Sequence, residues 1–280
     1  MIDQSKQIAK ESNSSFYYAF SLLAKPKRDA MNTVYAFCRK TDDIVDEGDE
    51  PEELKYERLR KWRIELEKAL YSTSDYHLFN KLASIIKQFN IPIDPFFDLI
   101  AGMEMDLQHK RYHSFEELVQ YCYRVASTVG LMCIEIFGYK NKSAKDYAVN
   151  LGLAMQLTNI LRDVKKDSEK GRIYLPQNDL VKFQYSEQDI FEKRYDANFI
   201  SLMKFESDRA KDFFTKADLA LDFEDKPSLF PARAMQHIYQ RLLTKLEAEK
   251  FDVFNKKIKV GTFEKAAISV GVWAKYGLVY

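Results

Sequence analysis

Two pairs of aspartates, each spaced four residues apart, constrain this chain more than any other feature of its sequence. The first pair is Asp42 and Asp46, and the second is Asp163 and Asp167. On an α-helix this spacing puts both carboxylates of a pair on one face, one turn apart. Like charges at that distance destabilise a helix, so we expect a cation beside them. Mg²⁺ prefers carboxylate oxygens together with oxygens of a substrate phosphate, and the pairs therefore predict a Mg²⁺-diphosphate site between two helices.

Further polar residues extend each pair into a stripe along its expected helix. The first stripe, roughly 60° wide at the α-helical rotation per residue, contains Tyr35, Arg39, Asp42 and Asp46. The second, roughly 80° wide, contains Gln156, Asn159, Asp163 and Asp167. The other faces of both helices are mainly apolar, so each stripe is expected to face a polar cavity. Solvated outer faces are the alternative, and they are the usual fate of one isolated pair; the repeated arrangement favours the cavity.

The rest of the chain reads as a succession of helices. Expected helix starts lie at Pro51-Glu52-Glu53, Asp94-Pro95, Ser114-Phe115-Glu116-Glu117, Ser143-Ala144-Lys145-Asp146 and Ser186-Glu187-Gln188-Asp189. Gly138 and Gly171 follow long apolar-periodic runs and predict helix ends. No alternating strand pattern or fixed repeat occurs. With 46% hydrophobic residues and no Ser/Gly/Pro-rich linker, residues 1–280 are expected to form one all-α domain.

Composition excludes several other classes of protein. The 43 basic and 42 acidic residues give a net charge of +1, so no nucleic-acid partner is expected. Cys38, Cys122 and Cys133 lack metal-ligand spacing and are expected to be buried free thiols. The N-terminus has no secretory core, and no apolar run reaches the length of about eighteen residues needed to span a membrane. We therefore expect a cytoplasmic protein.

Several segments, in order, resemble the motifs of the squalene/phytoene synthase family. They are residues 14–20 (SSFYYAF), 35–46 (YAFCRKTDDIVD), 121–126 (YCYRVA), 156–163 (QLTNILRD) and 172–176 (RIYLP). The resemblance extends over about residues 14 to 260. One departure stands out: the family usually has Gly-Glu between the aspartates of its second motif, and this chain has Lys165-Lys166.

The resemblance implies an isoprenoid-synthase-type helical bundle with a central cavity, and it implies roles for individual residues. Catalytic roles fall to Tyr35, Asp42, Asp46, Tyr123, Asp163, Asp167 and Tyr239. Metal ligands would be Asp42, Asp46, Asn159, Asp163 and Asp167, which would hold Mg²⁺, with Mn²⁺ as a substitute. Substrate-binding residues would be Ser15, Arg39, Arg111, Gln156, Asn159 and Arg162, and for Arg111 an ordinary surface ion pair is the alternative.

Within the family, Tyr17-Tyr18, Met103-Glu104-Met105-Asp106 and the RIYLP segment look most like presqualene diphosphate synthase of the bacterial hopanoid pathway. That enzyme joins two farnesyl diphosphates head-to-head. Phytoene synthase, which uses geranylgeranyl diphosphate, is the alternative, and a bifunctional squalene synthase would also need NADPH. The chain lacks Gly-x-Gly-x-x-Gly, so NADPH is not expected.

Expected partners are prenyl diphosphate substrates, a downstream squalene-forming enzyme, and peripheral contact with the inner membrane face for a lipophilic product. A non-enzymatic assembly factor of the same fold is a further reading, and a terpene cyclase is another. Both intact aspartate pairs argue against the assembly factor.

Overall fold

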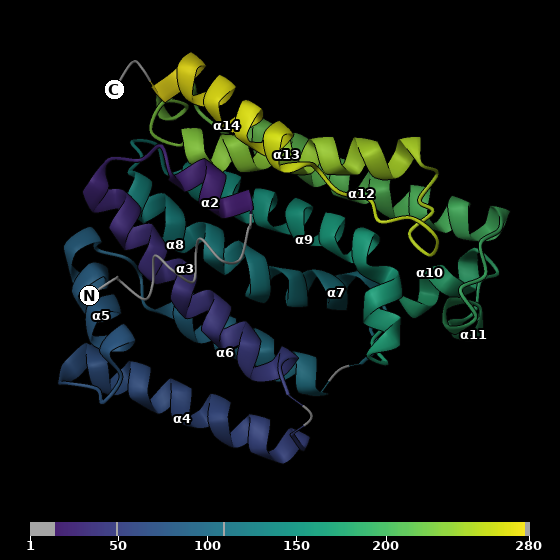
Figure 1. Ribbon diagram of the computed structural model, residues 1–280, viewed down its shortest axis with the longest axis horizontal. Coiled ribbons are helices and arrows are strands. Elements are labelled where there is room, and N and C mark those ends of the chain that lie inside the picture. The colour runs from purple at the N-terminus through teal and green to yellow at the C-terminus, as the bar shows by residue number, and fades with distance from the viewer. Residues whose placement is uncertain (1–14, 49, 109, 278–280) are drawn as a thin grey trace.

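The structure is a computed structural model that describes residues 15–48, 50–108 and 110–277. Across these ranges the chain is helical, with no strand, and the expected all-α fold is confirmed (Figure 1). The α-helices are α2 (Ser15–Phe20), α3 (Lys25–Asp46), α4 (Glu52–Tyr71), α5 (His77–Phe89), α6 (Asp94–Gln108), α7 (Phe115–Cys122), α8 (Thr128–Phe137), α9 (Ala144–Glu169), α10 (Gln177–Lys182), α11 (Glu187–Phe191), α12 (Ala197–Ala220), α13 (Phe230–Ala248) and α14 (Thr262–Tyr276). Short π- and 3₁₀-helices, η1 (Tyr123–Ser127) and η2 (Phe223–Asp225), complete the set.

Local sequence signals set many of the helix ends. Ser114 caps α7 by accepting a hydrogen bond from the Glu117 amide, and Ser186 forms a capping box with Asp189 at the start of α11. Gly138, with φ of 79°, ends α8, and Gly171, with φ of 75°, follows the end of α9. A left-handed backbone of this kind favours glycine, so the expected stops are confirmed.

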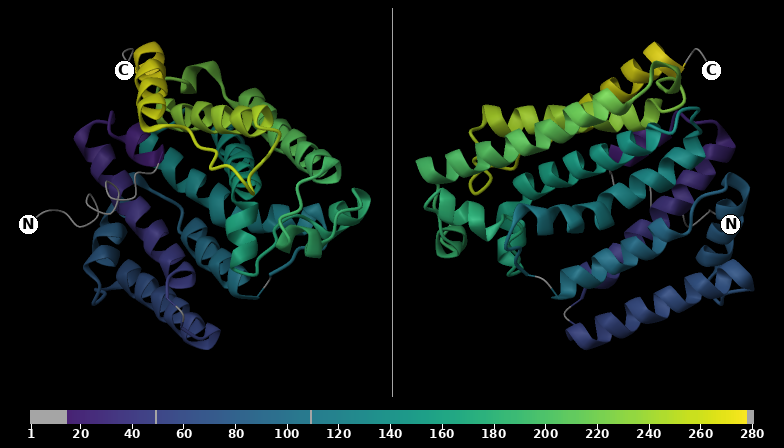
Figure 2. Two further views of the ribbon diagram at one scale, coloured as in Figure 1. Left: turned by 45° about the vertical axis from the view of Figure 1, so that its right-hand side comes forward. Right: turned by 180° about the vertical axis from the view of Figure 1, so that it is seen from behind.

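The bundle is organised around α9, which packs against α12, η1, α8 and α13. On the other side of the molecule, α3 packs against α5, α6 and α8. Figures 1 and 2 show α4 at one margin of the bundle and α14 at the opposite margin. Large side chains such as Phe37, Phe96, Tyr147 and Phe199 are fully buried between these layers. The two helices that carry the aspartate pairs thus share α8 as a neighbour and otherwise pack against different helices.

The continuous helical segment from α7 to α8, which packs against α9, contains a turn of π-helix. α7, η1 and α8 follow one another without a break, and the central turn Tyr123–Ser127 has π geometry. A π turn holds more residues than an α turn, so it changes which side chains face inward on either side of it. Such turns are frequent at functional sites, and this one lies against α6 and α9.

Gly152 permits the close approach of α9 to this π turn. A Cβ atom at Gly152 would lie 2.5 Å from the Ser127 Cα and 2.7 Å from the Ser127 amide nitrogen. Gly152→Ala should therefore destabilise the protein by about 1–3 kcal/mol through overpacking, measured by denaturant unfolding. Gly271→Ala, in the open middle of α14, is the control. It should raise stability by about 0.5–1 kcal/mol, because alanine favours a helix over glycine. Equal behaviour of the two variants would contradict the packing argument.

Candidate functional site

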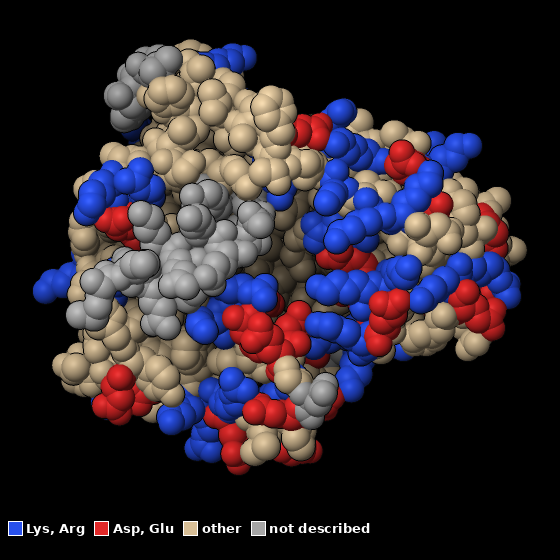
Figure 3. Space-filling model, viewed as in Figure 1, with Lys and Arg blue, Asp and Glu red and all other residues tan. Residues whose placement is uncertain are grey.

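A cavity of about 610 Å³ opens between the two aspartate-bearing helices. Figure 3 shows it as a hollow bordered by acidic and basic side chains. Its polar mouth is lined by Tyr35, Arg39, Asp42, Asp46, Asp106, Gln156, Asn159, Arg162, Asp163, Lys166, Asp167, Arg172, Tyr174 and Lys265. Its apolar wall includes Phe16, Leu99, Met103, Val129, Cys133, Ile134, Phe137, Leu151, Met155 and Met235. One end of the cavity is therefore suited to charge and the remainder to hydrocarbon.

Basic side chains hold the carboxylates on the α3 wall. The Arg39 guanidinium forms ion pairs with Asp42 at 3.4 Å and with Asp43 at 2.7 Å. Arg172 donates to Asp46 at 2.9 Å, and the Lys170 ammonium lies 3.2 Å from the other Asp46 oxygen. Lys170 and Arg172 come from the turn after α9, so this contact joins the two walls across the mouth.

The α9 wall repeats the arrangement with a different cation. Arg162 donates to both oxygens of Asp163, at 2.8 and 2.5 Å. The Asn159 amide nitrogen donates to Gln156, while the Asn159 Oδ1 atom is buried and accepts no hydrogen bond. A buried amide oxygen without a donor is costly, so Asn159 presents an open ligand to the cavity.

Burial and the charges of neighbouring groups shift the pKa values of the aspartates at the mouth. Burial and the neighbouring Asp46 raise the pKa of Asp42 to about 6. Burial and the neighbouring Asp163 raise the pKa of Asp167 to about 7. Burial acts in the same direction on Asp46, but the hydrogen bond and charge of Arg172 keep its pKa below the usual value. Raised carboxyl pKa values in a cavity are typical of functional sites, since a bound cation would relieve them.

A buried network of tyrosines lies next to the mouth. Asp106 is only 6% exposed and accepts hydrogen bonds from the Tyr174 hydroxyl at 2.7 Å and from the Tyr121 hydroxyl at 2.9 Å. The Tyr121 and Tyr174 rings are stacked with centroids 5.2 Å apart. Burial raises the pKa of Asp106, and the two hydroxyls act against that rise. The network holds a further carboxyl group, that of Asp106, at the cavity that the aspartate pairs line.

The structure brings most of the predicted site residues together at this cavity. Those that line it are Tyr35, Arg39, Asp42, Asp46, Gln156, Asn159, Arg162, Asp163, Asp167 and Tyr239. Tyr123 does not line it; Tyr121 does, because side chains two residues apart on a helix point roughly 200° apart. The apolar spacing of Leu118, Tyr121, Cys122 and Val125 was the available signal for Tyr121. The side chain of Ser15 lies outside the described residues.

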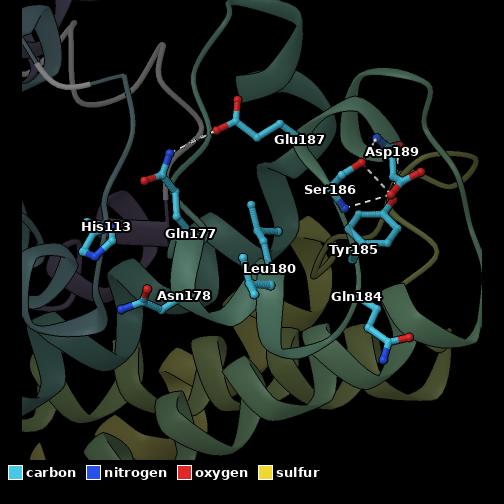
Figure 4. Close-up of a pocket in the computed structure, with 10 residues that line it drawn as sticks. His113, Gln177, Asn178, Leu180, Gln184, Tyr185, Ser186, Glu187 and Asp189 are labelled. Atoms are coloured by element: carbon cyan, nitrogen blue, oxygen red, sulfur yellow. Dashed lines mark hydrogen bonds between the residues drawn. The ribbon is translucent and has the colours of Figure 1, made fainter.

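Arg111 also lies away from this cavity. Its guanidinium donates to Glu187 at 2.7 Å and to the carbonyl of Gly171 at 2.8 Å. Glu187 borders a second, open hollow of about 570 Å³ at α10 and α11, drawn in Figure 4. Its polar groups bond to one another, as in the contacts of Ser186 with Asp189 and of Gln177 with Glu187. Arg111 therefore braces this region and the turn after α9.

Four residues at the mouth were not assigned roles from the sequence. Arg172, Tyr174 and Asp106 lie within segments that resemble family motifs, so their motifs were a signal. Lys265 comes from the N-terminal half of α14, and no pattern in the sequence links α14 to the aspartates. Lys166 is exposed at the edge of the cavity, whereas the Lys165 ammonium donates to the Phe254 carbonyl at 2.8 Å.

The donors at the mouth fit a hard divalent cation. They are carboxylate and amide oxygens, which Mg²⁺ prefers, and the Asn159 oxygen lacks any other partner. In the part of the chain that the structure describes, no three or more His, Cys, Asp or Glu side chains form a ready-made metal cluster. The oxygens instead form two pairs on separate walls, an arrangement suited to ions shared with a substrate diphosphate.

Comparison with known proteins gives a consistent result. The model of the squalene/phytoene synthase family matches residues 9–264. The 15-cis-phytoene synthase of Synechococcus elongatus is 35% identical over 275 residues, covering 94% of this chain and 89% of the relative. A dehydrosqualene synthase structure has a TM-score of 0.85 at 28% identity, covering 99% of this chain and 96% of that one. The squalene synthase HpnC of Alicyclobacillus acidocaldarius has a TM-score of 0.78 at 25% identity, with 89% and 95% covered.

The raised pKa of Asp167 predicts a pH-dependent stability. The folded protein binds a proton at Asp167 up to about pH 7, while the unfolded chain releases it near pH 4. This group therefore lowers stability as pH rises from about 4 to 7, and the loss is complete above that range. Without added metal, Asp167→Asn should be more stable than wild type by about 1–2 kcal/mol at pH 8, since solvent screens a half-buried carboxylate.

Thermal unfolding in the presence of a chelator, at pH 5 and pH 8, measures this difference. The gain should be much smaller at pH 5. Asp146→Asn, at an exposed position near the start of the same helix, is the control. A pH-independent gain, or a loss of stability at pH 8, would contradict the assigned repulsion.

Proposed function

Because this chain belongs to the squalene/phytoene synthase family, we propose that it joins two prenyl diphosphates head-to-head, with Mg²⁺ as cofactor. The observation that carries the proposal is the pair of opposed aspartate walls at the mouth of an apolar cavity. The charged end suits the diphosphates and the apolar remainder suits the prenyl chains. An assembly factor of the same fold would not need both aspartate pairs.

The residues at the mouth would divide the work of binding and leaving-group departure. Asp42, Asp46, Asn159, Asp163 and Asp167 would hold Mg²⁺, which when bound neutralises the diphosphate and helps it to leave. The guanidinium groups at the mouth would contact diphosphate oxygens in bidentate fashion; they belong to Arg39, Arg162 and Arg172. These arginines already bind aspartates there, so they are positioned before a substrate arrives.

The rest of the cavity would protect the reacting chains. Ionisation releases the first diphosphate and leaves an allylic carbocation, which the double bond of the second substrate attacks, and loss of a proton closes a cyclopropane that still carries the second diphosphate. For phytoene, that diphosphate then leaves, the ring rearranges and opens, and a second proton is lost. The apolar wall excludes water, and aromatic faces at Phe16, Tyr35 and Phe137 can stabilise positive charge. Tyr121, Tyr174 and Tyr239 also line the cavity and add hydroxyl groups to it.

The relatives favour phytoene synthesis from geranylgeranyl diphosphate over the farnesyl reading expected from the motifs. The curated relatives at 35–36% identity are phytoene synthases, from cyanobacteria as well as plants. The farnesyl reading is kept as the second candidate because the dehydrosqualene synthase structure matches 99% of this chain. Our first candidate is therefore geranylgeranyl diphosphate as substrate with phytoene as product, and farnesyl diphosphate is the second candidate substrate.

Incubation of the pure protein with farnesyl or geranylgeranyl diphosphate and Mg²⁺, with and without NADPH, tests the proposal. We expect geranylgeranyl diphosphate to be turned over faster and to give phytoene without NADPH. Presqualene diphosphate from farnesyl diphosphate would support the second candidate, and squalene formed only with NADPH would assign a reductive step. A cyclic product from one substrate, or no turnover of either, would overturn head-to-head condensation.

Replacement of one aspartate on each wall should abolish turnover without unfolding the protein. Asp42→Asn and Asp163→Asn should each lower kcat by about 10² or more, as expected when a preorganised electrostatic contact is lost. Both should keep their helical circular dichroism. Asp146→Asn is the control on α9 and should retain activity. Turnover near wild type in a folded, Mg²⁺-saturated Asp163→Asn protein would disprove the metal assignment.

Lys166 should strengthen diphosphate binding in a salt-dependent way. Since α9 continues to Glu169, Lys166 lies at the edge of the cavity instead of replacing a ligand. Lys166→Glu should weaken binding of inorganic diphosphate roughly threefold to tenfold at low ionic strength, and the difference should shrink as salt screens the charge. Titration calorimetry across a salt series measures it. Lys142→Glu, exposed before the start of α9, is the charge-matched control, and equal affinities for both variants would mean that Lys166 is solvated surface.

A further inference from the structure

The outward face of the helix α14 is uncharged along its whole length. Its residues are Phe263, Ala267, Val270, Gly271 and Ala274, hereafter the α14 face, and all are exposed. They lie within an arc of roughly 100° on the helix. Phe263 is 86% exposed and Val270 is 50% exposed. The opposite side of α14 is buried through Ser269 and Val272, and the helix packs on α13 and α2.

This face departs from what a surface helix normally presents. A helix that packs on a core usually exposes charged and polar side chains on its other side. A contiguous exposed apolar face marks a site of interaction with another protein or with a membrane. None of the helices in the described ranges is both long and apolar enough to cross a bilayer. Contact through α14 would therefore be lateral, with the helix lying in the surface of its partner.

The charges around the α14 face are mostly positive. Residues 255–277 contain five lysines, Lys256, Lys257, Lys259, Lys265 and Lys275, and one acidic residue, Glu264. Glu264 is neutralised within the protein, because Arg241 donates to it at 2.6 Å and Lys245 at 2.5 Å. Exposed Lys257 and Lys259 precede the helix, and exposed Lys275 is near its end. An apolar face with lysines at both ends is complementary to an anionic lipid surface.

The α14 face also lies beside the mouth of the cavity. Lys265 of the same helix lines the cavity, as do Phe16 of α2 and Tyr239 of α13, the helices on which α14 packs. Figure 3 shows the uncharged surface over α14 and the hollow on the same side of the molecule. A planar partner resting on α14 would therefore be close to the point where an apolar product leaves.

We propose that the α14 face and its flanking lysines dock the protein on a bilayer that contains anionic lipids. A second copy of the chain fits this surface less well, because two such faces would bring lysines against lysines. The benefit to product release rests on the proposed function, since only a hydrocarbon product needs a path that avoids water. The docking itself depends only on the apolar face and the charges.

Vesicle flotation of the full chain tests the docking surface. Wild type should float with phosphatidylcholine–phosphatidylglycerol vesicles and much less with phosphatidylcholine alone. The double variant Phe263→Glu, Val270→Glu should lose about tenfold or more of this binding, because it removes apolar burial. Lys257→Glu and Lys259→Glu should each lose about fivefold or more at low salt and less at high salt. Tyr71→Glu, at an 80% exposed position at the end of α4, is the control and should float like wild type.

Controls on folding, oligomeric state and turnover make the result decisive. Circular dichroism and thermal unfolding must show that each variant is folded; if the double variant is not, Val270→Ser alone and the lysine variants carry the test. Failure of wild type to float, or equal flotation of the α14 variants, overturns the proposal. So does a wild-type dimer that becomes monomeric in the double variant. Turnover in detergent is a separate readout, which the double variant should retain; its absence in wild type would overturn the proposed function and leave the docking result intact.

Discussion

Repulsion between carboxylates at the mouth of the cavity is the constraint around which the site is arranged. Asp42, Asp46, Asp163 and Asp167 face a shared space, and burial together with the charge of a neighbouring aspartate raises the pKa of Asp42 and of Asp167. Basic side chains on both walls act against this rise, because a positive charge beside a carboxylate lowers its pKa. Each arginine there serves one wall, except Arg172, which follows α9 in sequence and binds Asp46 of α3. The packing of both α3 and α9 against α8 keeps the pairs from relaxing apart.

This arrangement explains why the same residues suit an anionic substrate. A cluster of carboxylates that is balanced by arginines and lysines carries little net charge, yet both kinds of group are available for exchange. A diphosphate would take over the arginines, and divalent ions would take over the aspartates. The cost of crowding four acidic groups would be relieved in one binding event. The stability that the crowded carboxylates cost the protein would thus be the source of affinity for its ligands, a common feature of functional sites.

The sequence predicted the helical fold, both stripes and ten of the residues that line the cavity, because helical spacing alone decides which side chains share a face. The family resemblance placed Tyr123 at the cavity, but Tyr121 lines it, since a two-residue offset turns a side chain to nearly the opposite side of a helix. Arg111 was expected at the diphosphate, but its partner Glu187 is distant in sequence and no local pattern reveals that contact. Lys265 was missed for the same reason, since only tertiary packing brings α14 to the mouth. The length of prenyl chain that the protein accepts depends on the cavity as a whole, and no short sequence motif encodes the shape of that cavity.

The π turn between α7 and α8 also separates two tasks that one regular helix would couple. Before the turn, Tyr121 supplies a hydroxyl to the acidic network; after it, Val129, Cys133, Ile134 and Phe137 supply the hydrocarbon wall. The additional backbone residue acts as a phase adjustment between these halves, and each half can drift in sequence while the other keeps its orientation. Deleting one residue within Tyr123–Ser127 would restore a regular helix with the two halves in nearly the same relative orientation, because a π turn spreads about one rotation over one more residue than an α turn. The modularity of this helix would let the size of the hydrocarbon chamber evolve while the polar chemistry at the mouth is retained.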